Sequence, residues 1–131
     1  MKKLVKRFIA AALFSAPVIV TAGTITCGGT IDMVVVHQPG FVGVKLTSMN
    51  DYAFVCRIDA DYTPAGAATI TPTVCKALYA GLVTAKVNKL NVTNLWFDGD
   101  AVPSSCTTWA GGAVSSIKCI TGLMNRIGLQ L

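Results

Sequence analysis

Five cysteines, all located after an N-terminal export signal, restrict the possible folds of this chain more than any other feature. They are Cys27, Cys56, Cys75, Cys106 and Cys119. In an oxidising compartment such thiols pair as disulfides, and small secreted domains use these bonds to supplement a small core. The cysteines therefore predict a disulfide-stapled domain rather than a set of reactive or metal-binding thiols.

Residues 1–22 have the pattern of a secretory signal peptide: a basic start, an apolar run over residues 8–20 and a small-residue ending at Ala22. The run contains Ser15 and Pro17 and is shorter than the roughly 20 residues of a membrane span. We therefore expect cleavage after Ala22 and export to the periplasm or the extracellular space. After cleavage we expect no membrane attachment.

The mature part, residues 23–131, has the size of one small domain. Four of the eleven Lys and Arg residues belong to the signal, so seven remain against six Asp, and the net charge falls from +5 to +1. No basic patch with interleaved aromatic residues is present, so we expect no nucleic-acid partner. Glu is absent, His37 is the single histidine, and no nucleophile–base signature occurs. We expect no catalytic residues, no enzyme activity and no cofactor.

Periodicity predicts the secondary structure of the mature part. Alternating and β-branched residues predict strands over 30–37, 41–48, 52–58, 92–98 and 113–121. Apolar residues three and four apart predict a helix over 72–88, with Thr71 as N-cap and Pro72 in its first turn. One helix between the third and fourth strands is the order of the five-stranded OB barrel. We expect a mostly-β, OB-like barrel; a two-layer packing of a meander and one helix is the alternative.

The cysteine positions suggest two disulfides. Cys56 lies on the third strand and Cys75 in the first helical turn, so their bond would close the intervening loop, worth about 3 kcal/mol in chain entropy. We also pair Cys27, before the first strand, with Cys106, in the loop before the last strand. Cys119 would then be a free or intermolecular thiol; a bond from Cys119 to Cys106, which frees Cys27, remains open. No CxxC pair accompanies the single histidine, so we expect no metal site.

Four residues of two loops are the candidate ligand-binding set: Tyr62 from loop 59–70, and Ser104, Ser105 and Trp109 from loop 101–112. An aromatic ring among hydroxyl groups is a plausible composition for a glycan-binding site, although Trp109 could equally pack in the core.

A second aromatic position lies on the fourth predicted strand. Trp96 and Phe97 are neighbours there, so one side chain points inward and the other outward. We expect Trp96 to pack in the core or to shield a disulfide.

Several segments resemble a known family. YAFVCRI, TPTVCKALYAGLVTA, a strand with FDGD and a late SSC together are similar to the binding (B) subunits of AB-type toxins of the subtilase-cytotoxin and pertussis-like kind. The resemblance covers Tyr52 to Cys106 and rests on the layout of the cysteines. It implies an OB barrel that assembles into rings of five, binds cell-surface glycans and partners a catalytic toxin chain. No sugar-contacting residue of the family can be matched, and the fifth cysteine and the apolar tail over residues 123–131 depart from its pattern.

Two functions of different class follow from the sequence. The first is a secreted, non-enzymatic module that binds glycans and acts as a homo-oligomer, like a toxin B subunit. The second is a small periplasmic or cell-surface structural or inhibitor protein without a small-molecule site. The oligomeric state and glycan binding would separate the two.

Overall fold

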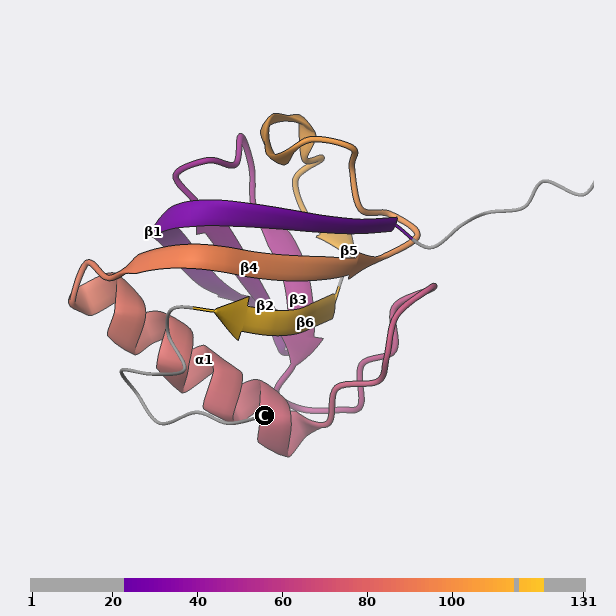
Figure 1. Ribbon diagram of the computed structural model, residues 1–131. Helices are drawn as coiled ribbons and strands as arrows, with labels where there is room; N and C mark the ends of the chain where they lie inside the picture. Colours follow the sequence, from indigo (N-terminus) through magenta and orange to yellow (C-terminus); the bar gives the residue numbers. More distant parts are fainter. Residues whose placement is uncertain (1–22, 115, 122–131) are drawn as a thin grey trace, which may run out of the picture.

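The computed structural model describes residues 23–114 and 116–121, with only the backbone for residues 113–121. The expected signal peptide and residues 122–131 lie outside the described part. Strands dominate the described residues, and a single α-helix packs beside them (Figure 1). The described part of the chain is therefore mostly β with one α-helix, as the sequence predicts.

The first three strands form an antiparallel meander. They are β1 (Gly23–His37), β2 (Phe41–Leu46) and β3 (Ala53–Arg57), and β2 pairs with both of its neighbours. The alternation predicted for the second strand is confirmed, because Val42, Val44 and Leu46 are fully buried.

β1 begins seven residues before the predicted start at Thr30, so Cys27 lies within this strand rather than before it. The first part of β1 pairs with β4 and the second part with β2, and bulges after Cys27 and Ile31 bend the strand between the two ladders. Gly28 and Gly29 indicated a strand boundary in the sequence, but they permit this bend. A Cβ on Gly28 would lie 2.7 Å from the carbonyl oxygen of Thr93, and Gly29 has a φ of +121°.

The helix α1 (Pro72–Val87) joins the meander to β4 (Asn91–Gly99). Its start is the predicted one: the Thr71 side chain accepts a hydrogen bond from the Val74 amide, and Pro72 stands in the first turn. The buried side of the helix is a narrow stripe with the spacing of one helical face; it consists of Cys75, Leu78, Gly81, Leu82 and Ala85.

The strand order is β5-β3-β2-β1-β4-β6. β5 (Ala113–Val114) runs parallel to β3, and β6 (Ser116–Thr121) runs antiparallel to β4. The two strands lie at opposite ends of this order, yet a single residue separates them in the chain. The predicted single strand over 113–121 is therefore found as two segments.

Both predicted disulfides are present in the structure. Cys56–Cys75 ties β3 to the first turn of α1, and Cys27–Cys106 ties β1 to the short 3-10 helix η1 (Cys106–Thr108). Cys119 belongs to neither bond and lies on β6, where its backbone pairs with that of Trp96.

Candidate functional site

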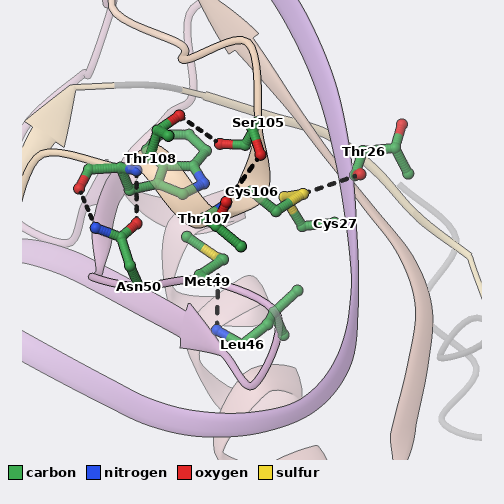
Figure 2. Close-up of a disulfide and its surroundings, with 10 residues drawn as sticks. Thr26, Cys27, Leu46, Met49, Asn50, Ser105, Cys106, Thr107 and Thr108 are labelled. Atoms are coloured by element: carbon green, nitrogen blue, oxygen red, sulfur yellow. Dashed lines mark hydrogen bonds between the residues drawn. A yellow bond between two sulfur atoms is a disulfide. The ribbon is translucent and has the colours of Figure 1, made fainter.

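The loop that carries most of the predicted ligand-binding residues is fastened to the body of the domain. Cys106 is bonded to Cys27, and its Sγ lies 3.3 Å from the carbonyl oxygen of Thr26 (Figure 2). On the other side, the Asn50 amide group forms two hydrogen bonds with the backbone of Trp109, of 2.6 and 2.8 Å. These contacts tie the loop to β1 and to the segment that follows β2.

Trp109 is a core residue. Its side chain is 2% exposed and lies edge-to-face on Phe97, with the ring centroids 4.9 Å apart. Its indole Nε1 is buried and has no hydrogen-bond acceptor among the described residues. A ring in this position cannot stack on a ligand, so the glycan-binding interpretation of Trp109 is wrong, and the core interpretation holds.

The other three predicted residues do not come together around Trp109. Tyr62 is buried, and its hydroxyl lies 3.4 Å from the carbonyl oxygen of Phe54. The hydroxyl of Ser105 caps η1 by accepting from the Thr107 amide. Ser104 is exposed. The four residues therefore do not make a single site, and three of them, Trp109, Tyr62 and Ser105, have structural roles.

Trp96, which we expected in the core, is exposed instead. Its neighbours Leu95 and Phe97 are fully buried, so the strand alternation turns Trp96 outward with 37% of its surface accessible. Trp96 is therefore an aromatic side chain that a ligand can reach.

Polar side chains surround this tryptophan on the outer face of β1 and β4. Thr26 is its directly opposite partner on β1, and the next outward pair is Thr24 and Asp98. The Thr24 hydroxyl donates to the Asp98 carboxylate over 2.7 Å. Asn94, two residues before Trp96, is half-buried on the same strand. We call Thr24, Thr26, Asn94, Trp96 and Asp98 the Trp96 face.

The Trp96 face combines a flat ring with hydrogen-bonding groups at a fixed spacing. Opposite residues in an antiparallel ladder have their Cβ atoms about 5 Å apart, and diagonal ones about 7–8 Å. An indole offers an apolar surface at little cost in conformational entropy. The hydroxyl and amide groups beside it can donate and accept hydrogen bonds, and the carboxylate can accept them. This arrangement suits a ring-shaped ligand with one apolar side and a hydroxylated rim.

A second group of aromatic rings covers the outer face of the meander. We call this group the meander cluster; its members are His37, Phe41, Tyr52, Phe54 and Tyr62, and neighbouring rings in it have centroids 5.1 to 6.5 Å apart. These rings pack mainly on one another. Their principal role is therefore to cover the sheet.

One ion pair borders the meander cluster. The Arg57 guanidinium lies 4.8 Å from the ring centroid of Phe41 and pairs with Asp59 at 2.6 Å. The hydrogen bond from Arg57 lowers the pKa of the Asp59 carboxyl, and the same bond raises the pKa of Arg57. Both groups are therefore charged at neutral pH.

A second ion pair joins β1 and β2. Lys45 binds the Asp32 carboxylate at 2.7 Å and lowers the pKa of that group through this hydrogen bond. Within residues 23–114 and 116–121, no three His, Cys, Asp or Glu side chains gather in a way that could hold a metal ion. In the same part of the chain, no helix is long and apolar enough to cross a membrane.

Comparison with protein-family models, with curated proteins and with solved structures gives no match.

Proposed function

We propose that this protein is an exported, non-enzymatic module that binds glycans through the Trp96 face. The observation that carries the proposal is the exposed Trp96 ring with Thr26 directly opposite and the bonded Thr24–Asp98 pair beside it. The C–H side of a sugar ring can lie on the indole, while its hydroxyls reach the threonine and carboxylate oxygens. The two disulfides support export, because such bonds persist in oxidising compartments.

The same proposal includes an OB-like fold. β1 lies between β2 and β4, and α1 connects β3 to β4. β5 contacts β3 and β6 contacts β4, with one residue between them. If β5 and β6 are two halves of one fifth strand, that strand bridges both ends of the sheet and gives the partly open, five-stranded barrel of this fold.

The experiment is a glycan array probed with the protein purified from the periplasm of cells that express the full chain. Trp96→Ala should weaken the binding of any positive glycan about tenfold or more, the usual loss when a central aromatic contact is removed. Val74→Ala is the matched control, because Val74 on α1 has the same 37% exposure as Trp96. An array without a positive glycan, or equal binding by both variants, would exclude this function.

Assembly is tested separately. A toxin B-subunit-like protein would form a homo-oligomer, so we expect a mass several times that of the monomer in size-exclusion chromatography with light scattering. The run is repeated with reductant, because an oligomer linked through Cys119 would separate. A monomer under both conditions would contradict the oligomer but not glycan binding.

A second candidate function is a structural or inhibitor protein that binds a protein partner. The exposed Met33 favours it, because this residue lies on the same face of β1 as Val35 and His37, beside the meander cluster. Met33→Asp should then abolish capture of the partner, whereas Trp96→Ala should leave it unchanged.

A further inference from the structure

A groove of about 440 Å³ lies where the C-terminal end of α1 meets the bent part of β1. Its walls are residues 30–32 of β1, Thr47 after β2, and Lys86, Val87 and Lys89 from the end of the helix. The Thr47 amide donates to the carbonyl oxygen of Thr30 over 3.0 Å and so holds the two threonines side by side. The groove lies at the Thr30–Asn91 end of the β1–β4 ladder, and none of its lining residues belongs to the Trp96 face.

Positive charge is concentrated around this groove. Lys86 and Lys89 line it, and Lys45, outside the lining, forms an ion pair with the lining residue Asp32. The Asp32 carboxylate is held by Lys45, and the Lys86 ammonium donates to the Asp32 backbone carbonyl. An ammonium group has three N–H donors, so each of these lysines retains donors for a ligand. Three lysines against one aspartate give the groove a net positive charge.

The conformation of Lys89 is a second, independent observation. Lys89 follows the C-cap Asn88 and has a φ of +50°. The Leu90 amide closes the helix end by donating to the Ala85 carbonyl over 2.9 Å. Glycine is the usual residue at this left-handed position, because a side chain there is strained. Strained backbone retained by a charged residue beside a groove points to a role for its side chain.

Two acidic residues, Asp98 and Asp100, lie at the far end of β1 and β4. Thr30 and Asn91 pair at the groove end, while Thr24 and Asp98 pair at the other end (Figure 1). Asp100 follows Asp98, and its amide donates to the carbonyl of Ala65 in the loop that also carries Asp59 and Asp61. This separation of charge directs an approaching anion toward the groove.

We propose that the groove binds a tetrahedral oxyanion, a phosphate or sulfate group. The ammonium groups of Lys86 and Lys89 and the hydroxyls of Thr30 and Thr47 supply hydrogen-bond donors from several sides. Lysine is a common partner of phosphate, as a point charge. The concave form of the groove suits an anionic group that enters it rather than a flat membrane surface.

The test is a titration followed by ¹⁵N–¹H NMR at constant ionic strength, with sodium phosphate, sodium sulfate and sodium chloride as probes. Phosphate and sulfate should shift the amides of residues 30–32, 47 and 86–89 in a saturable way, and chloride should not. Shifts that do not saturate, or equal shifts with chloride, would overturn the proposal.

Three variants make the test specific. Lys86→Gln and Lys89→Gly should each weaken phosphate binding about three- to fivefold, the effect expected of one exposed charge. Lys89→Gly should at the same time raise the melting temperature, because glycine relieves the strain at this position. A purely structural role would predict no loss of binding. Lys76→Gln, an exposed position near the start of α1, is the matched control and should bind normally.

The source of the anionic group is a further arm of the experiment. Tighter binding of a sulfated disaccharide than of free sulfate would assign the groove to a modified saccharide, and equal binding would assign it to the free ion. If phosphate and sulfate cause no saturable shifts but the Trp96 face still binds glycans, only the proposal of anion binding in the groove is overturned. If the groove binds these anions but Trp96→Ala leaves glycan binding unchanged, only the proposal of glycan binding at the Trp96 face is overturned.

Discussion

At the scale of single residues, the two tryptophans differ from what their positions in a loop and in a strand suggest. Trp109 comes from a loop rich in Ser and Thr but is buried, whereas Trp96 comes from a strand and is exposed. The sequence of the strand does indicate that Trp96 points outward. Asn94 and Asp98 share the outward alternation with Trp96, whereas Leu95 and Phe97 share the inward one. The burial of Trp109 depends on contacts with Asn50 and Phe97, which no local pattern shows.

The first prediction compares these two residues. Trp109→Ala should lower the free energy of unfolding by about 3–5 kcal/mol, because it leaves a cavity beside Phe97. Trp96→Ala should lower it by less than Trp109→Ala does, since Trp96 is 37% exposed and Trp109 only 2%. Urea unfolding followed by circular dichroism measures both values. Equal losses would contradict the placement of the two rings.

The second prediction concerns the close approach of β1 to β4. Gly28→Ala should destabilise the fold by about 1–3 kcal/mol, because the new Cβ would lie 2.7 Å from the Thr93 carbonyl oxygen, which belongs to a fixed backbone. Gly23→Ala is the matched control on the same strand. Its Cβ would meet only ordinary contacts at 3.4 to 3.6 Å, so urea midpoints near the wild-type value are expected.

At the scale of elements, the sequence predicts the helix and most strands well because their signals are local. Thr71 and Pro72 define the helix start, and alternation defines β2. β1 is the exception, since Gly28-Gly29 has the local character of a turn. Only the pairing of Cys27 with Leu95 and of Gly29 with Val92 shows that the strand continues through these glycines. Long-range pairing overrides local propensity at this point.

The third prediction concerns the two disulfides, which close loops of different length. Their sequence separations are 79 residues for Cys27–Cys106 and 19 for Cys56–Cys75. In the chain-entropy estimate the longer bond contributes about 4.5 kcal/mol and the shorter about 3 kcal/mol. Replacing both cysteines of a pair by alanine should therefore cost more for Cys27–Cys106, as measured by urea unfolding. A larger loss from the Cys56–Cys75 variant would show that packing in the core, not loop closure, dominates.

At the scale of the whole molecule, both candidate binding surfaces are assembled from segments that are separate in the sequence. The groove combines residues 30–32 with Lys86 and Lys89, and the Trp96 face combines Thr24 and Thr26 with the second half of β4. Each contributing segment has an unremarkable composition. The order of the elements was accessible from the sequence, but the strand register that assembles both surfaces was not.

The fourth prediction concerns the stability of the fold in acid. Two ion pairs make this stability depend on pH. Arg57 and Lys45 hold the pKa values of Asp59 and Asp32 below those of the unfolded chain, about 3.9 for Asp. Each carboxylate therefore stabilises the fold fully above that unfolded pKa, and the contribution disappears as the pH falls through the lower, folded pKa. We expect the melting temperature to fall between about pH 5 and about pH 2.

Variants of one pair identify its share of this acid sensitivity. Asp59→Asn should reduce the difference in melting temperature between the two ends of this pH range, since its amide does not titrate. Arg57→Gln should reduce it as well, because the hydrogen bond that lowers the pKa of Asp59 is lost. The double variant should show no more than the larger single effect, since both changes remove the same interaction. Additive effects of the two changes would mean that Asp59 draws its acid sensitivity from a partner other than Arg57.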